Sequence, residues 1–234
     1  MWLLPSKGRP HHLARFFAAC RITSASTEGV VIIDFADWSA RRTDYEALTP
    51  PPGWEIRGTE AVTQGDKIRE IWPEIEDRDW FGLIGDDNIP ETPMWDRRLI
   101  ERLNGWNIVS CNDGWQAPNR LGNCWVMAGP LVRLVGGVFP SGLQHLFVDD
   151  VWELLGRETG CWECLMDVTV RHAHVMKGEA PVDATHIGVY GEGFIGGQGP
   201  DREHGLWAKD EAIYRRWLIE DAPRLVAAIR EARA

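Results

Sequence analysis

The sequence contains no apolar run that approaches the roughly 18 residues of a membrane-spanning helix. It has no basic segment followed by an apolar one, which is the pattern of a secretory signal, and it has no low-complexity tract. From these absences we expect a cytoplasmic protein without a membrane span. The 234 residues, of which 44% are hydrophobic, are enough for one domain with a full core.

Basic residues are scarce relative to acidic ones. The chain has 25 Lys and Arg against 35 Asp and Glu, which gives a formal net charge of −10 at pH 7. Binding to a nucleic-acid phosphate backbone rests on clustered Lys and Arg. The charge balance therefore argues against nucleic-acid backbone as the main partner.

Cysteines are few, with five in the whole chain. Their odd number and scattered positions indicate reduced thiols rather than a disulfide framework. Cys161 and Cys164 have CxxC spacing, but the sequence has no second pair at zinc-ribbon distance and no thioredoxin-like context around them. We therefore assign no zinc or redox site to this pair.

The most informative stretch of the sequence is an apolar run that is followed by acidic residues. Residues 80–84 have the composition of a buried strand, and Asp86, Asp87 and Asn88 follow directly. Pro90 and Pro93 are expected to prevent further strand pairing. Carboxylate and amide oxygens suit Mg²⁺ or Mn²⁺, so the turn is a candidate metal motif. The alternative is an Asx-type turn that only caps the next helix.

The hydrophobic pattern predicts strands and helices that mostly alternate. This pattern favours an α/β fold in which a mostly parallel sheet is flanked by helices. The expected strands are 1–4, 29–34, 54–57, 80–84, 107–112, 124–127 and 166–174, and the expected helices are 11–20, 65–75, 95–103, 130–135, 147–156 and 209–234, the last interrupted near residue 223. In such sheets ligands bind outside the carboxyl ends of the strands.

The turn after the first strand is rich in hydrogen-bond donors. It contains Ser6, Lys7, Gly8 and Arg9 just before a helix N-terminus, which favours an anion. It matches neither the P-loop spacing nor the Rossmann fingerprint. Asp34 ends the second strand, where its carboxylate could accept hydrogen bonds from a ribose or a base, or could simply solvate a loop.

Two further groups carry potential chemistry. Asp149 and Asp150 lie in the first turn of a predicted helix, where they could cap it or, through mutual repulsion, acquire a pKa suited to a general base. His172 and His174 alternate on a predicted strand and would share one face. They could bind a metal or be ordinary surface residues. Residues 176–206 are rich in glycine and predict a lid, an acceptor-binding loop or a surface loop.

An ordered set of segments resembles the glycosyltransferase family 2-like proteins of the GT-A fold, and most closely the small versions of bacteriophages and prophages. The segments are LPSKGRP at 4–10, IID at 32–34, GDDN at 85–88 followed by WD at 95–96, LFVDDVW at 146–152 and HAH at 172–174. The resemblance covers roughly residues 1–176. It implies a GT-A core at 1–176 and a Gly-rich loop and C-terminal helix at 177–234 that pack on it.

The resemblance also implies roles for individual residues. The nucleotide-diphospho-sugar donor would be bound by Pro5, Ser6, Arg9, Asp34, Lys67 and Asp86. Mn²⁺ or Mg²⁺ would be held at the acidic motif by Asp87, with His172 or His174 completing the ligands. One carboxylate of the acidic pair, Asp150 rather than Asp149, would deprotonate the acceptor hydroxyl and give inversion at the anomeric carbon.

Several alternatives stay open at this stage. The fold could belong to a catalytically inactive nucleotide-sugar-binding protein, to a metal-dependent hydrolase or nucleotidyltransferase, or to a phage structural or assembly protein. The sequence does not define the acceptor, which could be a glycan, a modified DNA base or a protein, and it leaves the oligomeric state open.

Overall fold

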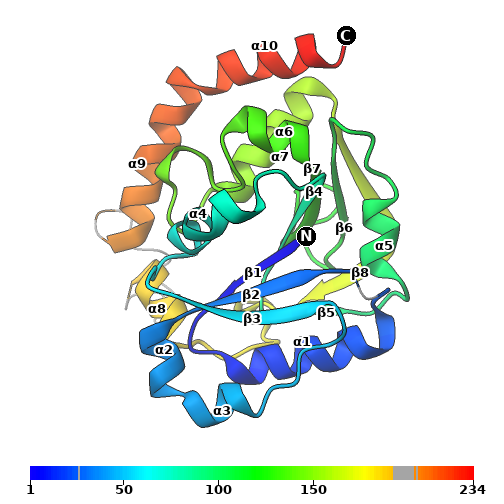
Figure 1. Cartoon of the computed structure of the whole chain (residues 1–234). Helices are drawn as coiled ribbons and strands as arrows, with labels where there is room; N and C mark the ends of the chain where they lie inside the picture. The colour runs from blue at the N-terminus through cyan, green and yellow to red at the C-terminus, as the bar shows by residue number, and fades with distance from the viewer. Residues whose placement is uncertain (26, 192–202, 204) are drawn as a thin grey trace.

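A computed structural model of the chain describes residues 1–25, 27–191, 203 and 205–234. The strands are β1 Trp2–Ser6, β2 Gly29–Asp34, β3 Trp54–Thr59, β4 Trp80–Ile84, β5 Asn88–Pro90, β6 Ile108–Asn112, β7 Cys124–Ala128 and β8 Trp162–His172. They form one sheet in the order β3-β2-β1-β4-β7-β6-β8-β5 (Figure 1). The α/β class predicted from the sequence is therefore confirmed.

The sheet is mixed, so the prediction of a mostly parallel sheet holds for β1 to β4 and is wrong for β7 and β5. Strands β1 to β4 pair in parallel, and β6 pairs in parallel with β8. Strand β7 pairs antiparallel with both β4 and β6, and β5 pairs antiparallel with β8. The reason is that the chain reverses between the ends of β6 and β7 without a crossover helix, and only such a crossover would make the two strands parallel.

Strand β5 also corrects the expectation that Pro90 prevents pairing. Asn88 pairs with His172, and Pro90 pairs with Val170 at the outer edge of the sheet. Proline is tolerated on an edge strand because its missing N–H can face away from the ladder. The pairing brings the acidic turn before β5 next to the end of β8.

Helices cover both faces of the sheet (Figure 1). They are α1 Pro10–Thr23, α2 Phe35–Ala40, α3 Arg42–Glu46, α4 Gln64–Ile75, α5 Trp95–Ile100, α6 Gly129–Val135, α7 Val148–Thr159, α8 Ala184–Tyr190, α9 Gly205–Glu220 and α10 Ala222–Ala232, with 3-10 turns η1 Pro140–Gly142 and η2 Val175–Lys177. One core cluster contains side chains of α4, α6, α7, α9 and α10, and the other contains side chains of α1, α3 and α5. Strand β2 contributes Val30 and Ile32 to the first cluster and Val31 and Ile33 to the second, as expected for a strand buried on both faces.

The C-terminal part consists of two helices, and Pro223 lies in the first turn of α10. Trp217, Leu225 and Ile229 are buried in the larger core cluster. Helix α8 lies within residues 176–206, for which the sequence predicts a loop, and the glycines at 193, 196, 197 and 199 are outside the described residues. The division at residue 176 stays a prediction.

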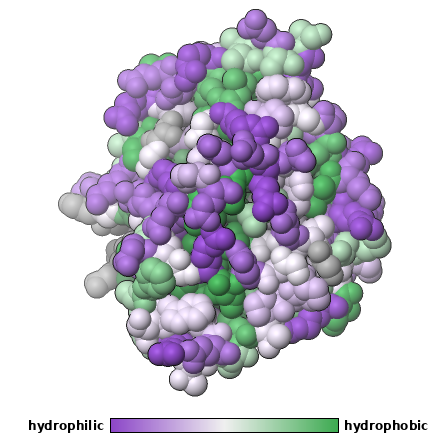
Figure 2. Space-filling model, in the orientation of Figure 1, coloured by the Kyte–Doolittle hydropathy of each residue, from purple (hydrophilic) through white to green (hydrophobic). Residues whose placement is uncertain are grey.

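The surface agrees with the composition. Figure 2 shows mostly hydrophilic side chains on one face of the molecule, with apolar ones between them. None of the helices described here has the length and apolar character needed to cross a membrane. All five cysteines are free thiols, as the sequence indicated.

Candidate functional site

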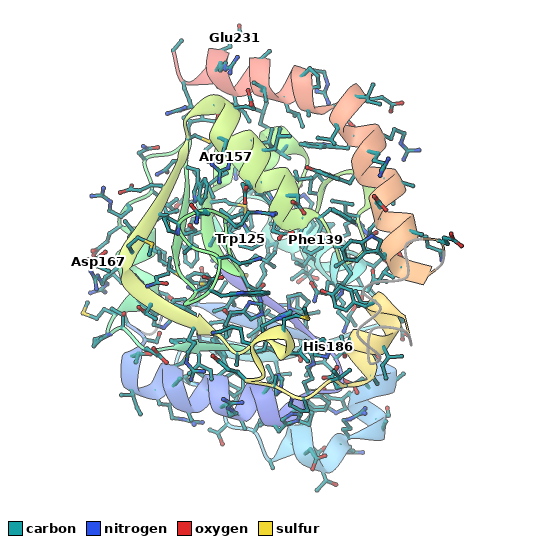
Figure 3. All side chains as sticks on the ribbon, turned by 180° about the vertical axis from the view of Figure 1, so that it is seen from behind. Trp125, Phe139, Arg157, Asp167, His186 and Glu231 are labelled. Atoms are coloured by element: carbon teal, nitrogen blue, oxygen red, sulfur yellow. The ribbon has the colours of Figure 1, made fainter. Side chains whose placement is uncertain are left out.

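A cavity of about 670 Å³ opens where several strands end. It is lined by residues from the end of β1, the turn after β4, the start of α7, the end of β8 and helix α8. Two of its lining residues, Trp125 of β7 and His186 of α8, are labelled in Figure 3. The cavity has the size of sites that hold small-molecule ligands.

The donor-rich turn after β1 is joined to the acidic turn after β4. The Ser6 hydroxyl donates to Asp86 Oδ2 at 2.7 Å, and Arg9 Nη1 donates to Asp86 Oδ1 at 3.0 Å. The Arg9 side chain is only 9% exposed although it lines the cavity. Pro5 lies beside them on β1 and also lines the cavity. Sequence positions that are 77 to 80 residues apart therefore meet at one place.

Lys67 and Asp34 form a buried ion pair behind this turn. Lys67 Nζ donates to the Ser6 carbonyl at 2.7 Å and to Asp34 Oδ2 at 3.2 Å. Burial opposes ionisation of Asp34, but the Asp37 amide and Lys67 outweigh it and lower the Asp34 pKa. Lys67 and Asp37 line the cavity. Asp34 is not among the lining residues, and its side chain caps helix α2. The contact of Asp34 with a nucleotide stays a prediction.

Asp87 and His172 face each other across the β5–β8 pairing. His172 Nε2 lies 3.4 Å from Asp87 Oδ2, and both side chains are almost fully buried. Asn123 Nδ2 lies 3.3 Å from Asp87 Oδ1 and 3.2 Å from His172 Nε2. Burial acts to raise the pKa of Asp87, but His172 and then Arg9 lower it overall, so Asp87 is held as a carboxylate.

His174 is close to His172 but has a different environment. The two rings are 4.8 Å apart between centroids, although β8 already ends at His172. His174 Nδ1 accepts from the Met176 amide at 3.1 Å, and its ring stacks on Trp115 at 4.7 Å. Burial and then His172 lower the pKa of His174 to about 4, so it is neutral at pH 7.

The side chains suit a divalent ion that is bound only partly by the protein. Among the described residues, no group of three or more His, Cys, Asp or Glu side chains could hold a metal ion. Asp87 and His172 offer one carboxylate and one imidazole, and His172 Nδ1 has no hydrogen-bond partner in the described part of the chain. Mg²⁺ and Mn²⁺ accept such donors together with substrate phosphates and waters. The donor set therefore fits an ion that shares its ligands with a substrate.

The acidic pair lines the cavity from the first turn of α7. Arg120 Nη2 donates to Asp150 Oδ1 at 2.6 Å. Burial and then the charge of Asp150 raise the pKa of Asp149 to about 6, and burial also raises the pKa of Asp150 against the effect of Arg120. The N-cap position belongs to Phe147, so neither carboxylate occupies it.

Asp183 belongs to the site, although the sequence pattern does not identify it as a site residue. Arg9 Nε donates to Asp183 Oδ2 at 2.6 Å, and Arg9 Nη2 donates to Asp183 Oδ1 at 3.1 Å. Asp183 and His186 form a reciprocal cap at the start of α8. An Asp followed three residues later by His could have signalled this helix start, but no pattern links Asp183 with an arginine 174 residues earlier.

Comparisons with known proteins identify the fold. No protein-family model matches the chain, and a search of curated proteins finds no match. Among solved structures, the mannosyltransferase PcManGT from Pyrobaculum calidifontis in complex with GDP-Man and Mn²⁺ superposes with a TM-score of 0.53 at 12% identity, over 97% of this chain and 72% of that one. Glucosyl-3-phosphoglycerate synthase from Mycobacterium tuberculosis, in complex with Mn²⁺, UDP-Glc and phosphoglyceric acid, gives 0.52 at 10% identity, over 80% of this chain and 74% of that one.

A third neighbour, S. aureus TarS, gives a TM-score of 0.51 at 10% identity, over 79% of this chain and 40% of that one. These neighbours are GT-A glycosyltransferases. At this level of identity they establish the fold alone. The chain therefore has a GT-A-like fold, with its cavity at the strand ends.

Proposed function

We propose that this protein is a metal-dependent glycosyltransferase that moves a sugar from a nucleotide-diphospho-sugar to an acceptor hydroxyl with inversion. The observation that carries the proposal is the meeting of the Ser6–Arg9–Asp86 network with the Asp87–His172 pair in one cavity. The GT-A-like neighbours support it because two of them are complexes with a nucleotide-sugar and Mn²⁺.

The donor diphosphate would bind beside the turn after β1. Arg9 supplies a buried cation, and the neighbouring Lys7 side chain is 48% exposed and also lines the cavity. Lys67 fixes the backbone of the same turn through the Ser6 carbonyl. A departing nucleoside diphosphate gains negative charge, and positioned cations stabilise that charge as it develops.

A divalent ion would be held by Asp87 and His172 and completed by donor phosphate oxygens. When bound, it would act as a Lewis acid toward the diphosphate. Asn123 holds both side chains by contacts of 3.2 and 3.3 Å, so they are positioned before the ion arrives. We propose that His174 orients His172 from its position against Trp115 rather than serving as a first ligand.

The acidic pair would take the proton of the acceptor hydroxyl. Asp150 is the base that the sequence resemblance implies, and Arg120 fixes one of its oxygens. Its neighbour Asp149 has a pKa raised to about 6 by burial and by Asp150, which brings the pair close to the range that suits general bases. A base opposite the leaving group gives direct displacement with inversion. The phage or prophage type and the cytoplasmic location stay predictions.

A thermal-shift panel of nucleotide-sugars with and without Mn²⁺ tests the proposal. A donor present at 100 times its dissociation constant adds about 2.7 kcal/mol of stability. For a domain of this size, that corresponds to a rise in melting temperature of roughly 5–11 °C. We expect this rise with one nucleotide-sugar, and a smaller one without Mn²⁺. No shift with any nucleotide-sugar would contradict the proposal.

Product analysis by mass spectrometry separates transfer from the related activities. Transfer adds a sugar-sized mass to the acceptor, and a hydrolase releases free sugar even when acceptors are present. A nucleotidyltransferase attaches the nucleotide instead. An inactive binding protein gives the thermal shift without any product.

A further inference from the structure

The cavity has an aromatic wall beside the acidic pair that the proposed donor chemistry does not use. The wall consists of Phe147, Tyr190 and Trp207, and all three line the cavity together with Asp149 and Asp150. The Phe147 and Trp207 rings meet edge to face at 5.4 Å, and Tyr190 and Trp207 lie 5.8 Å apart between centroids. We refer to these three residues as the aromatic wall.

Phe147 is held in an unusual backbone conformation. Its φ of 62° lies in the left-handed region, which bulky residues rarely adopt. Its ring stacks in parallel on Tyr214 of α9, with centroids 5.2 Å apart. Phe147 directly precedes helix α7, so its ring is fixed relative to the carboxylates in the first turn of that helix. Strained residues of this kind persist only where their surroundings determine them strongly.

Asp210 of α9 holds the segment before Phe147 in place. Its carboxylate is completely buried and accepts hydrogen bonds from the amides of Gln144, His145 and Leu146 at 2.9, 2.7 and 2.7 Å. Three backbone donors on one carboxylate make strong, charge-assisted hydrogen bonds, and we refer to this set of three as the clasp. The clasp fixes the segment that leads into Phe147. Asp210 is therefore a positioning residue for the aromatic wall and, through the start of α7, for the acidic pair.

Flat rings beside carboxylates match the chemistry of a saccharide. One face of a sugar ring presents C–H groups that pack against aromatic faces, and its hydroxyls donate hydrogen bonds to carboxylates. A nucleic-acid acceptor would also offer flat rings, but it would bring phosphates toward the acidic pair of a chain whose net charge is −10. An uncharged ring that carries hydroxyls avoids this charge repulsion.

We infer that the aromatic wall is the acceptor subsite and that the acceptor is a saccharide. The inference rests on the proposed sugar transfer and adds the substrate class to it. The sugar ring packs against the aromatic wall with one hydroxyl directed to the acidic pair, and Asp210 keeps the wall in place.

Phe147→Gly tests the subsite because glycine adopts the left-handed conformation without strain. The assay uses the nucleotide-sugar that binds in the thermal-shift panel, with methyl glycosides of common hexoses, a nucleoside and a Ser-containing peptide as acceptors. We expect kcat/KM for transfer to a glycoside to fall about tenfold, as for the loss of a strong aromatic contact. Donor affinity is expected to stay within about twofold, since donor binding does not use the subsite.

Two further variants complete the design. Phe147→Asn also tolerates the left-handed backbone and is expected to behave like the glycine variant. Phe35→Ala is the control, because Phe35 is an aromatic residue with 48% exposure that lies outside the residues lining the cavity. It is expected to leave transfer unchanged.

Asp210→Asn is compared with the control Asp221→Asn. Asp221 lies at the start of α10 and pairs only with Arg224 among the described ion pairs. We expect Asp210→Asn to lower kcat for transfer more than it lowers donor affinity. An equal loss of both would contradict a positioning role.

The outcomes separate this inference from the proposed function. Unchanged transfer by Phe147→Gly would overturn the subsite. Transfer by the wild type to the nucleoside or peptide and to no glycoside would overturn the saccharide class, while sugar transfer itself would stand. Failure of the wild type to bind any nucleotide-sugar would overturn both.

Discussion

Replacing Arg9 with methionine removes the cation that joins three carboxylates in the site. Arg9 contacts Asp86 at 3.0 Å, Asp183 at 2.6 Å and Asp87 at 3.9 Å, and its side chain is only 9% exposed. Removal of one partner from a buried ion pair costs about 3–5 kcal/mol because the remaining charges stay buried without compensation. For a domain of this size, the melting temperature is expected to fall by roughly 6–20 °C.

Arg57→Met is the matched control. Arg57 also pairs with two carboxylates, Glu55 at 2.9 Å and Glu74 at 2.7 Å, but its side chain is 34% exposed. Exposed pairs contribute at most about 1 kcal/mol, so a small change is expected. Thermal unfolding at pH 7 measures both variants. Equal melting temperatures for Arg9→Met and Arg57→Met would refute the reasoning about the buried network.

Three further predictions concern the base and the buried lysine. Asp150→Asn is expected to lower kcat for transfer by about 100- to 10,000-fold while donor affinity, measured by calorimetry, is retained; unchanged kcat would exclude Asp150 as the base. Because the pKa of Asp149 is raised to about 6, the acidic pair takes up a proton as the pH falls through that value, so kcat/KM is expected to decline below about pH 6 and to be flat from pH 7 to 8 in a pH profile. Lys67→Met removes the buried partner of Asp34 and leaves only the exposed Lys7, at 3.9 Å, so it is expected to cost about 3–5 kcal/mol in denaturant unfolding. The exposed Lys209→Met is expected to change little.

The sequence alone predicts the first half of the fold well for a physical reason. The β-branched run of β2 is apolar throughout because both faces of the strand are covered, and the helix period of α1 buries Leu13, Phe16 and Phe17 against the same sheet. Once parallel strands are inferred, their ends must share one edge of the sheet. The proximity of Asp86 to Ser6 and Arg9 follows from that rule.

The second half of the fold depends on information that local sequence patterns do not contain. The direction of β7 depends on how the chain turns after β6, and the apolar run of β7 is compatible with either direction. The β5–β8 pairing joins Asn88 to His172 over a long separation in sequence and includes a proline that argues against a strand. The contact of Asp183 with Arg9 and the clasp of Asp210 are tertiary hydrogen bonds of the same kind.

Calorimetric titration of the nucleotide-sugar with and without Mn²⁺ tests the central claim most directly. If Asp87, His172 and the donor diphosphate share one ion, each ligand must raise the affinity for the other by the same factor. We predict this reciprocal coupling for the wild type and its loss in Asp87→Asn. Nucleotide-sugar binding that is independent of Mn²⁺ in the wild type, or coupling that survives in Asp87→Asn, would contradict the account.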